Sequence, residues 1–175
     1  ELENKNLGEN GLFIYSDCGM IQNPTKEELV DIAYSSYKTF LTLIGNNPKI
    51  AFLSHSTNGS SKCSDVDKVK GAVNLFKEKY PDIIADGEMQ LDAAIIPKVA
   101  NAKYPTSKIK GDANILIFPD LDAGNIAYKI TERMANAKAY GPITQGIKKP
   151  INDLSRGCTK DDIVGVIAIT CLQAK

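Results

Sequence analysis

Short apolar runs alternate along the chain with longer segments whose apolar residues recur at helical spacing. The runs that predict strands are 12–15, 49–53, 83–85, 113–118 and, more weakly, 139–143. The segments that predict helices are 25–44, 66–80, 89–102 with an interruption at Pro97, 126–137 and 159–172. Strands and helices that alternate in this way predict an α/β fold, in which a mostly parallel sheet carries helices on both faces.

Residues at the helix ends support the first and the last of these helices. Thr25 and Glu28 have the spacing of a capping box, and Gly45 follows the last apolar position of that helix. Thr159 is the expected N-cap of the last helix, and Asp162 follows three residues later, where an acid stabilises a helix start.

Polar loops follow the predicted strands, at the edge where parallel sheets bind ligands. These loops are 16–17, 54–64, 86–90 and 120–125. Ser54, Ser56 and Thr57 give the second loop many hydroxyls, which could bind an anion. Because the loop lacks the Gly-Lys-Ser/Thr ending of a P-loop, these hydroxyls could instead serve only to shape the loop. Asp120 and Asn125 in the last loop could bind a ligand or a metal, but such spacing favours capping of backbone N–H groups.

The composition narrows the classes of partner. With 21 basic and 21 acidic residues the formal net charge is zero, which gives no support for binding to nucleic acid or to an anionic membrane. No apolar run reaches the roughly 18–20 residues that span a bilayer. The four cysteines form no CxxC pair and there is one histidine, so we expect reduced thiols in a cytoplasmic protein and no metal site.

The chain begins with Glu1 rather than Met, as expected for a processed or excised segment. Residues 1–10 are polar and predict a frayed start.

Residues 152–162 form the densest polar stretch, Asn-Asp-Leu-Ser-Arg-Gly-Cys-Thr-Lys-Asp-Asp, directly before the last helix. Helix starts expose unpaired N–H groups that attract anions, and the planar guanidinium of Arg156 suits phosphate. Ser155 and Gly157 beside it suit a turn, whereas Cys158 and Asp162 also have simple structural interpretations, as a buried thiol and a helix cap. Spacing alone predicts that Arg133, next to Glu132 on a helix, is a solvated side chain.

Several longer motifs make the chain resemble the C-terminal part of the phosphate acetyltransferases (phosphotransacetylases), within the phosphate acetyl/butyryltransferase family. The segments that carry the resemblance, which runs from about Gly11 to the end, are Pro-Thr-Lys-Glu-Glu-Leu-Val-Asp-Ile-Ala at 24–33, Asp-Val-Asp-Lys-Val at 65–69, Asp-Gly-Glu-Met-Gln-Leu-Asp-Ala-Ala at 86–94, Leu-Ile-Phe-Pro-Asp-Leu-Asp-Ala-Gly-Asn at 116–125, Gly-Pro-Ile-Thr-Gln-Gly at 141–146 and Asn-Asp-Leu-Ser-Arg-Gly-Cys at 152–158.

The resemblance implies reversible transfer of an acetyl group between coenzyme A and inorganic phosphate, with acetyl phosphate as the other product. It implies a fold similar to the isocitrate and isopropylmalate dehydrogenases, with two α/β domains, a cleft between them and a homodimer. Residues 11–140 would then form one domain, and residues 141–175 would return to the other. Coenzyme A would be a substrate, and no tightly bound cofactor is expected.

The resemblance also assigns roles to residues. Ser155, Arg156 and Asp162 fall on catalytic positions of the family, Arg133 falls on an arginine that binds substrate, and Cys158 lies in the same motif near the site. The corresponding hypothesis is direct attack of the coenzyme A thiolate on acetyl phosphate. The alternatives are an acyl carrier at Cys158, a phosphate butyryltransferase, a non-catalytic domain that senses acetyl-CoA, and an inactive fragment whose segment 145–175 lacks its partner.

Overall fold

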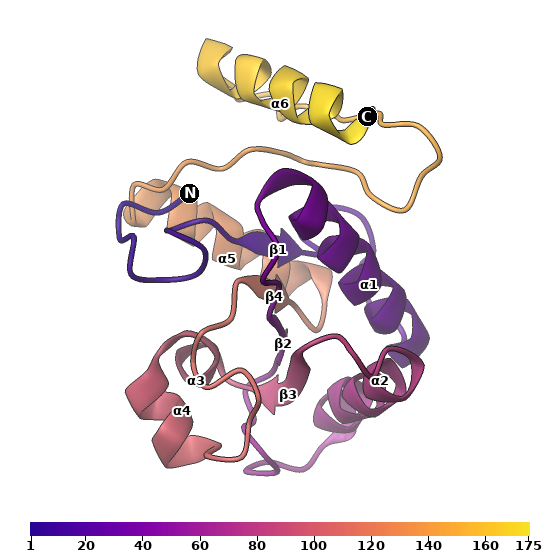
Figure 1. The fold of residues 1–175 in the computed structure, drawn as a ribbon, viewed down its shortest axis with the longest axis vertical. Coiled ribbons are helices and arrows are strands. Elements are labelled where there is room, and N and C mark those ends of the chain that lie inside the picture. The colour runs from indigo at the N-terminus through magenta and orange to yellow at the C-terminus, as the bar shows by residue number, and fades with distance from the viewer.

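The computed structural model describes residues 1–175 and has a four-stranded, all-parallel sheet in the order β1-β4-β2-β3 (Figure 1). The strands are β1 Ile14–Ser16, β2 Ile50–Leu53, β3 Ala85–Met89 and β4 Ile115–Ile117. The helices are α1 Lys26–Leu43, α2 Ser64–Lys79, α3 Leu91–Ile95, α4 Pro97–Lys103, α5 Leu121–Met134 and α6 Lys160–Gln173. The predicted α/β fold with a parallel sheet is confirmed.

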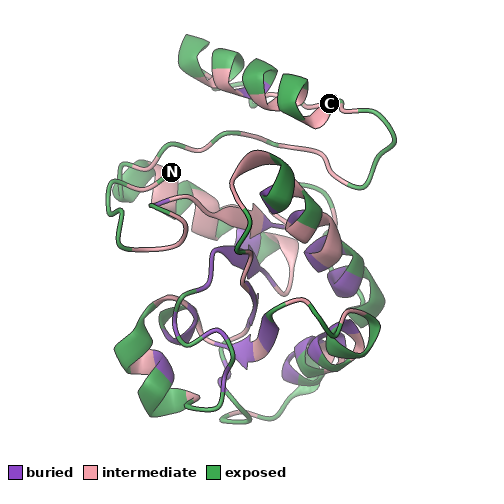
Figure 2. Ribbon diagram, viewed as in Figure 1, coloured by how far each residue is buried: buried purple, intermediate pink, exposed green.

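The sheet separates two hydrophobic cores, because alternate residues of a strand point to opposite faces. Ile50 and Phe52 of β2 pack with α1 and α2 on one face, whereas Ala51 and Leu53 pack with α3 and Met89 on the other. Figure 2 shows the buried residues concentrated on the strands and on the inner sides of these helices. Strands buried on both faces appear in the sequence as continuous apolar runs, which explains why 49–53 and 113–118 were recognisable.

The expected ends of α1 and α6 are present. The Thr25 hydroxyl accepts from the Glu28 amide at 3.2 Å, and the Glu28 carboxylate accepts from the Thr25 amide at 2.8 Å. The amide of Gly45 returns to the Phe40 carbonyl directly after α1. None of the helices is both long enough and apolar enough to cross a membrane.

Four predicted elements differ from the structure in position or type. The third strand covers Ala85–Met89 instead of 83–85, so most of the expected loop 86–90 lies within the sheet. Helix α5 begins at Leu121 rather than at residue 126, so the expected loop 120–125 is mainly helical. Residues 139–143 form no strand, and Pro97 starts a separate helix, α4, rather than interrupting one.

A long connection without regular structure, residues 135–159, leads from α5 to α6. In Figure 1 it crosses the upper side of the α/β body, and α6 lies beyond it at the top. Helix α6 is apolar on every side, yet Val166 is its one buried residue, and Val164 and Ile167 are 66% and 58% exposed. Helices that are apolar all round are normally buried in a core, so α6 has less cover than its composition requires.

A buried carboxylate joins α2, β3 and the segment after α4. Asp86 in β3 is buried, and its Oδ1 accepts from the Lys77 ammonium at 2.6 Å and from the Tyr104 hydroxyl at 3.1 Å. Burial alone raises the pKa of Asp86, but the hydrogen bond and charge of Lys77, with smaller help from Ser107 and the Gly87 amide, outweigh it and lower the pKa.

We predict that Lys77→Met destabilises the fold by about 1.5–3 kcal/mol at neutral pH, because it leaves the buried Asp86 carboxylate without its cation. The lowered pKa means that the charged form stabilises the native fold above the unfolded pKa, and that this stability disappears as the pH falls through the folded pKa. The difference between the two proteins should therefore shrink in acid. Urea unfolding measures it, with Lys70→Met on the same helix as the control; equal effects of both variants would contradict the prediction.

Candidate functional site

The polar motif before α6 forms an exposed turn. The Cys158 amide donates to the Ser155 carbonyl at 3.0 Å, and the Gly157 amide donates to Ser155 Oγ at 3.3 Å. Ser155 and Arg156 are both exposed at this turn. Since Ser155 Oγ accepts one bond, its own O–H is still available to donate to a ligand.

Asp162 closes the N-terminus of α6 in a capping box, as its spacing predicted. Its Oδ2 accepts from the Thr159 amide at 2.7 Å and from the Thr159 hydroxyl at 2.8 Å, while its own amide donates to that hydroxyl at 3.3 Å. These two bonds to Thr159, the backbone one first, lower the pKa of Asp162. The nearby charge of Arg133 lowers this pKa further, so the carboxylate is a weaker base here than an ordinary aspartate.

Arg133 reaches this region from the last turn of α5. Its side chain is 72% exposed, and its Nε lies 3.5 Å from a Glu132 oxygen. The solvated side chain predicted from spacing is present. A pocket lined by Lys138, Tyr140 and Asp161 puts the chain that follows α5 beside the start of α6. Ser155, Arg156, Cys158, Asp162 and Arg133 therefore belong to one region, the C-terminal site.

Hydroxyls of the loop 54–61 bind other parts of the loop and β3. Ser56 and Thr57 are buried. Ser56 Oγ donates to Glu88 at 2.7 Å, and Thr57 Oγ1 accepts from the Gln90 amide at 2.9 Å. Ser54 Oγ in turn accepts from the Ser56 amide at 3.1 Å. In this structure these hydroxyls stabilise the conformation of the loop.

No feature of the sequence indicated the role of Glu88. Its Oε1 accepts hydrogen bonds from both the Ser56 hydroxyl and the Gly59 amide. A carboxylate in an expected loop gave no sign that it would be buried in a strand. Loop 54–61 follows β2 in the lower half of Figure 1, whereas α6 lies at the top, so this chain does not bring the loop and the C-terminal site together.

Asp120 and Asn125 have structural partners. Asp120 is the N-cap of α5 and accepts from the Ala123 amide at 2.8 Å, as the capping interpretation predicted. The Asn125 amide donates to the Cys18 carbonyl at 3.0 Å, which ties α5 to the loop after β1. No group of three or more potential metal-binding His, Cys, Asp or Glu side chains gathers anywhere in the chain.

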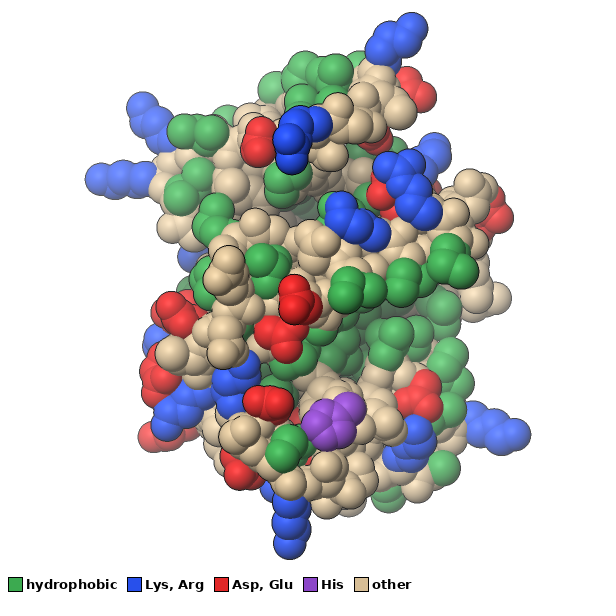
Figure 3. Space-filling model, turned by 180° about the vertical axis from the view of Figure 1, so that it is seen from behind, with side chains coloured by type: hydrophobic (Ala, Val, Ile, Leu, Met, Phe, Trp, Pro, Cys, Tyr) green, Lys and Arg blue, Asp and Glu red, His purple; other side chains and the backbone are tan.

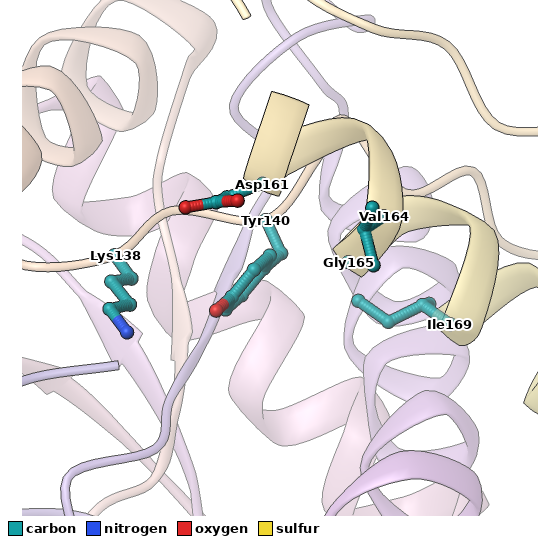
Figure 4. Close-up of a pocket in the computed structure, with 6 residues that line it drawn as sticks. All are labelled: Lys138, Tyr140, Asp161, Val164, Gly165 and Ile169. Atoms are coloured by element: carbon teal, nitrogen blue, oxygen red, sulfur yellow. The ribbon is translucent and has the colours of Figure 1, made fainter. Parts of the chain in front are cut away.

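A shallow pocket of about 400 Å³ lies between residues 138–140 and α6. Figure 4 shows Tyr140 lying against Gly165, with Lys138 and Asp161 at one side of the pocket. A Cβ at Gly165 would overlap the Tyr140 ring, so this glycine allows the ring to pack on the helix. The pocket borders the start of α6 and hence the C-terminal site.

Two amide side chains that sequence reasoning did not single out hold the connection in place. Gln145 Nε2 donates to Ser16 Oγ at 3.2 Å and to Ser36 Oγ at 3.0 Å, and its Oε1 accepts from Thr39 at 3.0 Å. Asn152 bonds to the far end of α6 through Thr170 and Gln173. Both residues lie within motifs that carry the family resemblance, but their partners are distant in sequence.

Comparison with known proteins gives consistent matches. Residues 4–171 match the family model described as phosphate acetyl/butaryl transferase. Phosphate acetyltransferases from Acetivibrio thermocellus and Clostridium acetobutylicum are each 55% identical to the chain, over 98% and 96% of its length. The chain spans about half the length of these curated relatives, 52% and 50%.

Two solved structures share the fold. A phosphotransacetylase from Staphylococcus aureus is 45% identical with a TM-score of 0.88, covering 93% of this chain and 50% of that one. A branched-chain phosphotransacylase from Enterococcus faecalis is 29% identical with a TM-score of 0.77, covering 91% of this chain and 58% of that one.

We predict that Thr159→Val raises the pKa of Asp162, because the variant removes the side-chain donor while keeping the backbone donor. Carbon-detected NMR titration of the Asp162 carboxyl measures this pKa. Thr42→Val is the control, since the Thr42 hydroxyl bonds only to the Lys38 carbonyl of its own helix. An unchanged Asp162 titration would mean that the Thr159 hydroxyl does not contribute to the lowered pKa.

Proposed function

The chain belongs to the phosphate acetyl/butaryl transferase family, and we propose that it supplies one half of an enzyme that moves an acetyl group reversibly between coenzyme A and inorganic phosphate. The observation that carries this proposal is the 55% identity to proteins named phosphate acetyltransferase, together with the exposed Ser155-Arg156 turn. The substrates are acetyl-CoA and phosphate in one direction, and acetyl phosphate and coenzyme A in the other. No tightly bound cofactor takes part in this proposal.

The proposed reaction is direct transfer while both substrates are bound. In the direction of acetyl-CoA formation, the thiol of coenzyme A gives its proton to Asp162, and the sulfur attacks the carbonyl carbon of acetyl phosphate. The carbonyl oxygen gains negative charge and accepts a hydrogen bond from Ser155. The bond between that carbon and the phosphate oxygen then breaks, and phosphate leaves with Arg156 and Arg133 as its cationic partners.

Proton transfer to Asp162 is the demanding part of this scheme. Ordinary pKa values are about 3.9 for aspartate and about 8.5 for a thiol, a gap that costs roughly 6 kcal/mol for complete transfer. The capping box lowers the pKa of Asp162, so it widens this gap. Asp162 therefore has to release the Thr159 hydroxyl when substrates bind, or accept the proton as the sulfur attacks. Cationic neighbours that lower the thiol pKa would help in both cases.

Two alternatives have specific support. Cys158 is partly exposed one residue before the N-cap of α6, where thiolates are stabilised, which would suit an acyl carrier. The likeness to the branched-chain phosphotransacylase favours a longer acyl substrate, although its 29% identity is well below the 55% of the acetyltransferases. A non-catalytic acetyl-CoA sensor is disfavoured because Ser155, Arg156 and Asp162 are all present.

We further propose that residues 11–140 form one domain and that 141–175 pack against a second domain, supplied by the half of the relatives that this chain does not span. The exposed apolar surface of α6 supports this arrangement, because contact with another body would bury Val164 and Ile167. Free thiols at Cys18, Cys63, Cys158 and Cys171 agree with a cytoplasmic location.

Homodimer formation is also part of the proposal. Ile126, Ile130 and Met134 recur every four residues on the outer side of α5 and are 57%, 51% and 81% exposed. Figure 3, seen from behind the view of Figure 1, shows hydrophobic side chains in a band across the middle of this face. Such an apolar stripe suits contact with the same helix of a second copy.

The central prediction concerns turnover by this chain joined to the remaining half of the Acetivibrio thermocellus relative. Asp162→Asn should lower kcat for acetyl-CoA formation from acetyl phosphate by about 10²–10⁴-fold, the usual contribution of a general base, with little change in coenzyme A binding. Cys158→Ala is the matched variant and should retain turnover. Near-normal turnover of Asp162→Asn would exclude it as the base, and loss of turnover in Cys158→Ala would favour the acyl carrier. Faster reaction with butyryl than with acetyl phosphate would contradict acetyl specificity.

For the dimer, we predict that Ile130→Asp shifts the sedimentation of the same joined protein from dimer to monomer, because a charge then lies in the middle of the apolar stripe. Lys129→Asp, on the neighbouring exposed position of α5, is the control for added negative charge. A dimer that survives Ile130→Asp must use another surface.

A further inference from the structure

Residues 152–159 run antiparallel to α6 and are fixed to it at both ends. At the far end of the helix, Asn152 Nδ2 donates to Thr170 Oγ1 at 2.8 Å and to Gln173 Oε1 at 2.7 Å. At the near end, Thr159 is bonded to Asp162 in the capping box. The turn that carries Ser155 and Arg156 lies between these two fixed points.

The length of chain between the fixed points limits its freedom. With a rise of 1.5 Å per residue, Thr159 and Thr170 are separated by about 17 Å along the helix axis. The residues from Asn152 to Thr159 run back along this span, and four of them form a turn whose ends are less than about 7 Å apart. With every other step extended, the backbone reaches about 20 Å, and the Asn152 and Thr170 side chains bridge part of the span. The turn therefore cannot slide far along α6 while both ends are bound.

The Asn152 side chain has a third partner in this arrangement. Besides the two bonds to α6, its Oδ1 accepts from the Thr144 amide at 2.9 Å, while the Thr144 hydroxyl donates to the neighbouring Ile151 carbonyl. Gln173 strengthens the same junction by donating to the Thr144 carbonyl at 3.3 Å. Thr144 is followed by Gln145, which binds β1 and α1, so Asn152 connects the helix, the turn and the α/β body.

We propose that Asn152 is a positioning residue, which holds the Ser155-Arg156 turn against α6 and so fixes its distance from Asp162. It touches neither substrate nor the reacting atoms, and it acts through the turn alone. For catalysis this inference rests on the proposed acyl transfer, but the attachment of the turn to α6 can be tested without any reaction.

Cys158 provides the test, because it lies inside the turn and is half-buried. In Asn152→Ala, alkylation of Cys158 by iodoacetamide, followed by mass spectrometry on this 175-residue chain, should become about ten-fold faster, as expected for an opening equilibrium that loses two hydrogen bonds. Thr170→Val removes one acceptor and should give about a three-fold increase. Exposed Cys63, at the start of α2, should keep its rate and serves as the internal reference.

Asn101→Ala, at an exposed position of α4 without a side-chain hydrogen bond, is the matched control. An unchanged Cys158 rate in both Asn152→Ala and Thr170→Val would overturn the proposal, as would a parallel rise at Cys63, which indicates general loosening. In the joined enzyme, Asn152→Ala should lower kcat at least ten-fold and change KM for coenzyme A less than two-fold. Faster alkylation of Cys158 with unchanged kcat would exclude the positioning role. If the joined protein without substitutions is inactive, the proposed function fails, and the alkylation rates alone decide whether Asn152 holds the turn.

Discussion

The position of the C-terminal site depends on the side-chain amide of Gln145. Helix α6 contacts the α/β body along α1, and the connection that leads to it has no strand or helix of its own. Near the start of the connection, Lys138 exchanges backbone hydrogen bonds with Glu1, and further along Gln145 binds the body through hydroxyls of β1 and α1 that include the buried Ser16 and Ser36. An amide suits this place because it can donate twice and accept once, and a carboxylate of the same shape would offer no donor.

The capping box of α6 places two demands on one carboxylate. As a cap, Asp162 stabilises the helix start best when it is ionised and bound to Thr159, and those bonds lower its pKa. As a base, it would need a higher proton affinity and a free oxygen. The unbound structure is adjusted to the first demand. In the proposed mechanism, substrate binding must supply the free energy that frees Asp162 from Thr159.

The sequence predicted the elements whose signals are local. The capping boxes at Thr25 and Thr159 and the buried runs at β2 and β4 depend on residues a few positions apart. The start of α5 was missed because residues 120–125 have the pattern of a polar loop after a strand; the structure needs Gly124 there, since a Cβ would collide with the Asp17 carbonyl. Strand β3 was misplaced because Asp86 and Glu88 look like loop residues until Lys77 and Ser56 approach them. The resemblance to the family pointed to the C-terminal site. It did not indicate the roles of Gln145 and Asn152, because Gln145 binds residues more than a hundred positions away and Asn152 binds residues about twenty positions away.

The two hydrophobic cores are built entirely from residues that precede the long connection, from Leu29 to Phe118. The α/β body can therefore reach its native packing before the last part of the chain has found its place. Residues 145–175 add one buried side chain, Val166, to the protein's interior. The interior of the body thus makes no demand on residues 145–175, and the turn with Ser155 and Arg156 can be lost without opening either core.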